Sequence, residues 1–93
     1  MRRLLSIYIL IMSCLCVMAQ TDRQHIRKGN RLYRQQKFDK SEIDYRKAVD
    51  RNQNNAQALY NLGCALMQQQ KDSAAVVQFE KASKLETDKK RKA

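Results

Sequence analysis

The sequence predicts an all-α fold of two tandem helix–turn–helix units, a short α-solenoid, preceded by a signal peptide. Three observations predict it. The chain aligns with itself at an offset of 34 residues, its apolar residues recur at helical spacing, and its 93 residues include two glycines and no proline. Both residue types disfavour helix interiors, so their scarcity suits an almost wholly helical chain. We expect helices near residues 22–36, 39–52, 55–69 and 72–86.

The first 19 residues have the three-part layout of a secretory signal peptide. Arg2 and Arg3 form a positive region, residues 4–15 form an apolar run, and residues 17–19 end in Ala19 as a cleavage site. The apolar run is shorter than the roughly 20 residues that span a bilayer. Cleavage after Ala19 is the favoured outcome. Lipidation at Cys14, which follows a loose lipobox, and a retained membrane anchor remain the alternatives.

The cysteines and charges limit the class of protein. Cleavage after Ala19 leaves Cys64 as the sole cysteine, which excludes an internal disulfide. The net charge is +10 for the whole chain; without Arg2 and Arg3, 17 Lys and Arg stand against 9 Asp and Glu, a net charge of +8. This excess attracts acidic proteins or lipid headgroups. Export argues against nucleic acid as a partner.

The internal repeat defines the expected core. Aligned positions share residue size, as for Gly29 with Gly63 and Tyr45 with Phe79. Small residues allow close helix approach, while the aromatic residues fill the space between layers. The polar run 52–55 separates the units, and its asparagines suit helix caps and turns. The expected repeat-core residues are Gly29, Leu32, Ser41, Tyr45, Ala48, Leu59, Leu62, Gly63, Leu66, Ala75, Phe79 and Ala82.

These motifs resemble the tetratricopeptide repeat (TPR) family. The second unit has Leu59-x-x-Leu62-Gly63-x-x-Leu66, followed by Ala75-x-x-x-Phe79 and Ala82. The first unit departs further, with His25 and Lys28 where large apolar residues are usual. The resemblance places one unit over residues 22–55, a second over 56–89 and the start of an incomplete third at 90–93. Repeat arrays bury their core by stacking, so either a longer chain or a partner is expected to complete this one, unless it is a marginal two-unit domain.

The resemblance implies a protein-binding scaffold whose first helices line a concave groove. Arg23, Arg27, Arg31 and Arg34 recur on one helix face, which predicts a basic groove for an acidic or extended partner segment. The alternative for this stripe is a solvated helix face. The groove positions carried over from the family are Arg23, Ile26, Arg27, Asn30, Tyr33, Arg34, Gln57, Tyr60, Asn61, Cys64, Met67 and Gln68.

No enzymatic activity, cofactor or metal site is expected. His25 is the only histidine, and nothing in the sequence marks a nucleophile beside a base. A glycine-rich phosphate loop and metal-ligand spacing are both lacking.

A narrower resemblance concerns cellular location. The Ala19-Gln20 junction and the first unit resemble exported repeat proteins of Bacteroidetes, including the aerotolerance-associated Bat (BatC-like) group. This implies a scaffold in the periplasm or at a membrane of a Gram-negative cell envelope. Two other readings stay open: a membrane-associated structural protein with a retained or lipidated N-terminus, and a truncated fragment of a longer scaffold. Self-association through an uncapped C-terminal repeat is a further expectation.

Overall fold

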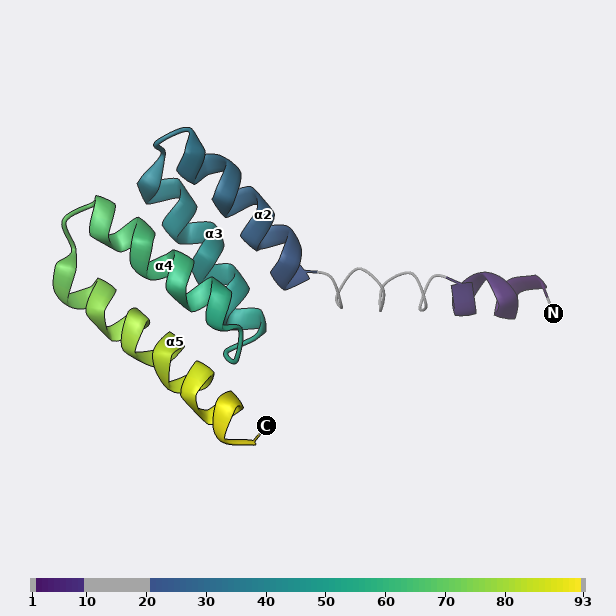
Figure 1. The fold of residues 1–93 in the computed structure, drawn as a ribbon. Helices are drawn as coiled ribbons and strands as arrows, with labels where there is room; N and C mark the ends of the chain where they lie inside the picture. Colours follow the sequence, from purple (N-terminus) through teal and green to yellow (C-terminus); the bar gives the residue numbers. More distant parts are fainter. Residues whose placement is uncertain (1, 10–20, 93) are drawn as a thin grey trace.

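Four helices form the repeat domain (Figure 1). The computed structural model describes residues 2–9 and 21–92. Its helices are α2 (Thr21–Arg34), α3 (Phe38–Arg51), α4 (Ala56–Gln68) and α5 (Asp72–Lys92). Each helix packs against the next, so α3 lies between α2 and α4, and α4 between α3 and α5. The described residues include no strand, and the predicted all-α fold of two helix pairs is confirmed.

The N-terminal region is described only in part. Residues 2–9 are helical, whereas Cys14 and the predicted cleavage site after Ala19 lie outside the described residues. Within the described ranges, no helix has both the length and the apolar character needed to cross a membrane.

The end of α5 differs from the prediction. We expected a helix over 72–86 and a new unit from residue 90, but α5 continues without interruption from Asp72 to Lys92. No glycine, proline or asparagine stands in this stretch to stop it. The basic run 89–92 also suits the negative end of the helix dipole. The predicted end of this helix at residue 86 is therefore wrong, and residues 90–92 belong to α5.

The same turn ends the first helix of each unit. Gln36 and Gln70, 34 residues apart, adopt left-handed backbone with φ of 62° and 63°. The next amide of each turn donates back to a helix carbonyl, Lys37 N to Leu32 O at 2.9 Å and Lys71 N to Leu66 O at 3.0 Å. These are Schellman turns, which satisfy carbonyls that would otherwise lack donors. The repeated Gln-Gln-Lys sequence thus encodes a repeated turn.

Asparagines form the connection between the two units, as predicted. Asn55 caps α4, because its side-chain oxygen accepts a hydrogen bond from Ala58 N at 3.1 Å. The Asn52 side chain accepts from Asn54 N at 3.1 Å and closes the preceding turn.

Glycine brings the two helices of each unit together. A Cβ atom at Gly29 would lie 2.5 Å from Cε1 of Tyr45, and one at Gly63 would lie 2.6 Å from Cε1 of Phe79. Neither ring could stay in place against an added methyl group. The Tyr45 side chain is 2% exposed, whereas Phe79 is only partly buried.

The core lies in two clusters that run through both units. Ten of the twelve expected core residues are buried, and Leu32 and Phe79 are partly buried. The larger cluster contains Tyr45, Leu62, Ala65, Leu66 and Ala75. The second cluster contains Ile26, Ala48 and Ala58.

Glu42 ties the first unit to the second by polar contacts. Its carboxylate lies 2.8 Å from Arg46 Nε on the same helix, 2.9 Å from Gln69 Nε2 and 3.2 Å from Lys71 Nζ. Burial raises the pKa of Glu42, but the hydrogen bonds from Arg46, Gln69 and Lys71 outweigh burial and hold the pKa below its ordinary value of 4.5. The ionised carboxylate therefore stabilises the joint between α3 and the α4–α5 turn.

The two glycine contacts predict unequal responses to alanine. Gly29→Ala should lower the free energy of unfolding by about 1–3 kcal/mol, because the enclosed Tyr45 ring has no room to move. Gly63→Ala should change it by less than about 1 kcal/mol, because Phe79 can shift outward and alanine favours the helix. Urea unfolding followed by circular dichroism measures both. Equal losses would contradict the difference in enclosure.

The Glu42 contacts predict a pH dependence. Because the folded-state pKa is lowered, the stabilisation is present above about pH 4.5 and is lost as the pH falls through the folded-state pKa. Between about pH 6 and pH 3 the parent should lose about 1 kcal/mol more stability than Glu42→Gln. Urea unfolding at each pH checks this, with exposed Glu80→Gln as the control. A Glu42→Gln profile parallel to that of the parent would refute the role of this carboxylate.

Candidate partner-binding groove

A large hollow lies along α4 and α5. It has a volume of about 810 Å³ and receives one side chain, Tyr33, from α2. The other lining residues are Ala56, Gln57, Tyr60, Cys64, Met67 and Gln68 from α4, and Phe79, Ala82, Ser83 and Glu86 from α5.

The α4 wall brings together most of the groove residues predicted in the second unit. Gln57, Tyr60, Cys64 and Met67 recur three or four residues apart, so they share one face of the helix. Tyr60 is 57% exposed and Met67 is 54% exposed, although both are large apolar side chains. The predicted residue Asn61 lies to one side and does not line this hollow.

Aromatic side chains form the floor of the hollow. The Tyr60 and Phe79 rings lie 5.4 Å apart, centroid to centroid. At one end, Tyr33 stacks edge-on against Phe38 at 5.0 Å, and its hydroxyl accepts a hydrogen bond from Gln68 Nε2 at 3.3 Å. Glu86 is the only charged residue in the lining. This part of the groove is therefore mainly apolar, and the predicted arginines do not line it.

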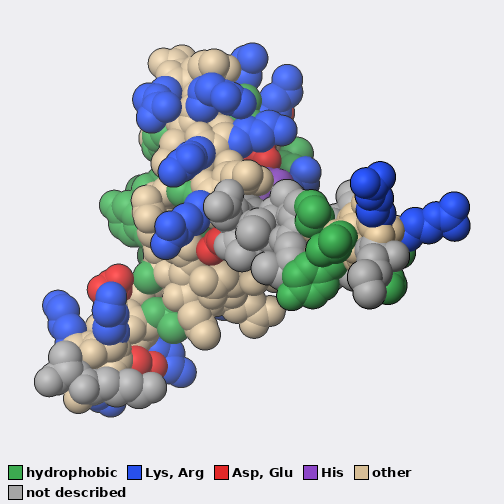
Figure 2. Space-filling view, turned by 90° about the vertical axis from the view of Figure 1, so that its right-hand side faces the viewer, with side chains coloured by type: hydrophobic (Ala, Val, Ile, Leu, Met, Phe, Trp, Pro, Cys, Tyr) green, Lys and Arg blue, Asp and Glu red, His purple; other side chains and the backbone are tan. Residues whose placement is uncertain are grey.

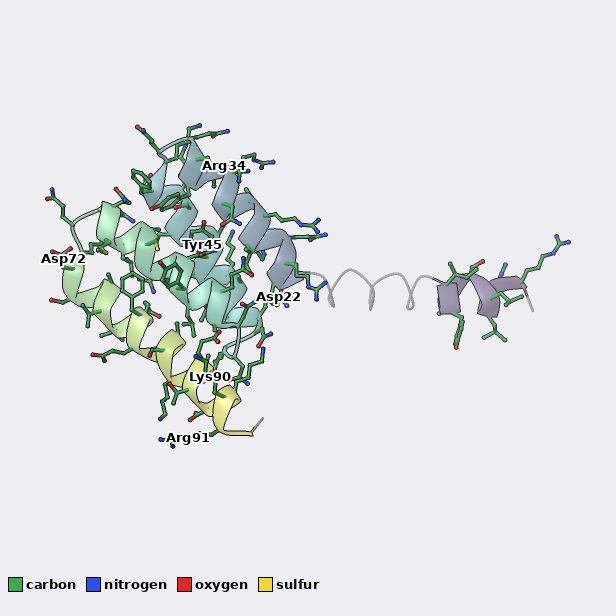
Figure 3. The ribbon with its side chains drawn as sticks, in the orientation of Figure 1. Asp22, Arg34, Tyr45, Asp72, Lys90 and Arg91 are labelled. Carbon is green, nitrogen blue, oxygen red and sulfur yellow. The ribbon has the colours of Figure 1, made fainter. Side chains whose placement is uncertain are left out.

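A smaller hollow of about 150 Å³ connects the first unit to this wall. It is lined by Asn30, Tyr33, Tyr45, Asn61 and Cys64. Asn30 Oδ1 accepts two hydrogen bonds, from the Tyr45 hydroxyl at 2.6 Å and from Asn61 Nδ2 at 3.2 Å. Tyr45 lies at the centre of the helical layers (Figure 3). Burial, with smaller contributions from Tyr33 and Cys64, raises the pKa of Tyr45 to about 12, so it stays a neutral donor.

The predicted arginines lie on α2, apart from the large hollow. Arg27 and Arg34 line a shallow hollow of about 530 Å³ together with Lys28, Asn30 and Arg31. Arg23 is exposed and lines none of these three hollows. Figure 2 shows Lys and Arg side chains gathered on this side of the molecule. The cationic surface thus adjoins the groove and does not form its floor.

Ile26 does not belong to the groove, which corrects that prediction. Its side chain is 7% exposed and packs with Ala48 and Ala58, between α2, α3 and α4. The two alanines leave a space that an aliphatic side chain fills.

The sequence interpretation missed the α5 wall. Ser83 and Glu86 were not assigned to any site, while Phe79 and Ala82 were assigned only to the core. The repeat alignment could have indicated this wall, because it makes α5 the equivalent of α3. The outer side of α3 is covered by α4, whereas no described helix covers the outer side of α5.

His25 has a structural neighbour. Its Nδ1 lies 3.4 Å from Oδ1 of Asp44, which is 4% exposed between α2 and α3. Within residues 2–9 and 21–92, no three His, Cys, Asp or Glu side chains gather closely enough to hold a metal ion.

The comparisons with known proteins agree with this architecture. Residues 29–70 match a family model described as TPR repeat, and residues 56–89 match one described as Tetratricopeptide repeat. The chain belongs to the tetratricopeptide repeat family. The two matches together span residues 29–89, about two thirds of the chain. Comparison with curated proteins and with solved structures found no match.

Membership of this family defines the broad role of the chain. Tetratricopeptide repeats generally mediate protein–protein interactions and are typically scaffolds without enzymatic activity. The hollow along α4 and α5 is accordingly the candidate partner site of this TPR protein.

Proposed function

We propose that this TPR protein is an adaptor that holds an extended partner segment along its concave groove. The observation that carries the proposal is the large hollow with Tyr60 and Met67 more than half exposed. Exposed apolar side chains around a concavity favour a partner that removes them from water. Apolar side chains of the partner would rest on this floor.

The partner segment carries acidic residues at one end. The three hollows share lining residues: Tyr33 and Cys64 join the large hollow to the small one, and Asn30 joins the small one to the hollow beside Arg27. A bound segment can follow this path from an apolar floor to a cationic edge. Guanidinium groups pair with carboxylates in bidentate geometry, so Arg27 and Arg34 suit an acidic end.

The adaptor acts in the cell envelope of a Gram-negative bacterium. The layout of residues 1–19 supports export, and the resemblance to exported Bacteroidetes repeat proteins of the Bat group supports an assembly scaffold there. Both supports come from sequence.

Capture from the native cell envelope tests the groove. The full chain, tagged at its C-terminus, should enrich a protein, and Arg27→Glu/Arg34→Glu and Met67→Glu should each lower its capture about tenfold. The first variant reverses charges that meet acidic groups, and the second puts a charge on the apolar floor. Quantitative mass spectrometry of the captured proteins measures the ratio.

Two matched variants control for charge and for fold. Lys40→Glu/Lys47→Glu makes the same change in net charge at exposed sites of α3 that line none of the hollows. Val77→Glu puts a carboxylate on an exposed valine of α5 outside the groove. Both controls should retain capture, and circular dichroism should show equal helicity. Equal capture by the groove variants and the controls would refute this site.

A second candidate is a membrane-associated structural protein. The helix over residues 2–9 supports it, because Leu4, Leu5 and Ile9 are all more than 60% exposed and follow two arginines. Such a helix suits insertion into lipid next to anionic headgroups.

The intact mass of the protein isolated from its own cells separates the two candidates. A chain that begins at Gln20 is the expected result and supports the exported adaptor. A chain that retains Met1, or one acylated at Cys14, would support the membrane-held protein instead.

A further inference from the structure

One face of α5 is open where the matching face of α3 is covered. In the first unit, α4 packs over α3 and leaves Tyr45 2% exposed. At the equivalent position Phe79 is only partly buried, and Val76 nearby is 51% exposed. The outer side of α5 is thus a helix-packing surface on which no described helix lies.

The open face follows a regular spacing. Six residues recur four and three positions apart, which places them on one stripe of the helix. Three of them, Phe79, Ser83 and Glu86, line the large hollow and are therefore accessible. The stripe consists of Asp72, Val76, Phe79, Ser83, Glu86 and Lys90.

The outer face of α2 in another copy does not fit this surface. Where α4 presents Ala58, Leu62 and Ala65 to α3, the equivalent residues of α2 are Gln24, Lys28 and Arg31. Stacking α2 on α5 would place Lys28 and Arg31 against Val76 and Phe79, where α4 places Leu62 and Ala65 against α3. Head-to-tail stacking of copies is therefore disfavoured.

We infer that two copies of this chain pair through their α5 helices, antiparallel about a twofold axis. The ends of the stripe are complementary, because Asp72 is acidic and Lys90 is basic. Figure 3 shows Asp72 at one end of α5 and Lys90 and Arg91 at the other. An antiparallel pair sets each acidic end against the basic end of the second copy. A parallel pair would bring the two basic ends together.

The same register fits the middle of the stripe. With Asp72 opposite Lys90 of the second copy, Phe79 lies opposite Ser83 and Val76 opposite Glu86. A large ring then meets a small side chain, and valine meets the aliphatic part of the glutamate. Twofold symmetry makes every contact twice. The stripe has two apolar residues and each copy has a positive net charge, so we expect a weak, reversible dimer.

Sedimentation equilibrium of the full chain, from low to high micromolar concentration, tests the pairing. The parent should show a reversible monomer–dimer equilibrium. Val76→Glu should weaken it at least tenfold, whereas Val77→Glu, an equal change on a neighbouring exposed valine outside the stripe, should leave it unchanged. Association through the N-terminal apolar run would respond to neither variant.

A charge swap tests the register. Asp72→Lys and Lys90→Asp should each weaken the dimer about three- to tenfold, and the double variant Asp72→Lys/Lys90→Asp should restore it. Restoration also separates pairing from misfolding, which a second substitution would not repair. A parent that stays monomeric, equal effects of Val76→Glu and Val77→Glu, or a swap that restores nothing would overturn the inference. The stripe shares Phe79, Ser83 and Glu86 with the hollow, so pairing and partner capture compete for this surface. Val76 and Asp72 do not line the hollow, so their variants should weaken the dimer without lowering capture.

Discussion

The structure depends on a close approach between glycine and an aromatic ring inside each helix pair. Gly29 faces Tyr45, and Gly63 faces Phe79, at distances that exclude even a methyl group. In each unit the ring of the second helix occupies the space that a side chain at the glycine would fill, so the two helices can approach closely. With each helix pair closely packed, α4 packs on α3 over a core cluster that includes Leu62 and Ala75. The groove along α4 follows from that packing.

The two glycine–aromatic contacts differ in polarity, and their surroundings differ accordingly. Tyr45 is enclosed and needs a partner for its hydroxyl, which Asn30 provides at 2.6 Å. In the second unit, phenylalanine replaces the tyrosine, and Cys64 stands where the asparagine was. The hydroxyl and its acceptor are both absent from the second unit, and among residues 2–9 and 21–92 no buried side-chain polar atom lacks a partner. The same exchange turns a polar joint between units into an apolar groove floor.

The sequence alone predicted much of the fold, because equivalent positions of the two units have side chains of similar size. The alignment of Gly29 with Gly63 located both helix pairs, and the asparagine run located the connection between them. The polarity of the groove was harder to predict. A stripe of arginines fixes one face of α2, but only packing shows that Ile26 turns inward between Ala48 and Ala58. The length of α5 was also underestimated, because the period of 34 residues implied a break that no residue of the helix enforces.

The departures of the first unit from the repeat pattern have a physical cause. Lys28 and Arg31 stand where α4 has Leu62 and Ala65, and in the described structure no helix packs against that side of α2. A helix face in contact with water carries charged residues, so the weaker match of the first unit to the family pattern coincides with a solvated face of α2. The outer face of α5 differs, because Val76 and Phe79 lie on it between acidic Asp72 and basic Lys90. The outer faces of α2 and α5 thus differ in chemistry. The charged face of α2 disfavours the packing of another helix, whereas the face of α5 suits an antiparallel helix with complementary charges.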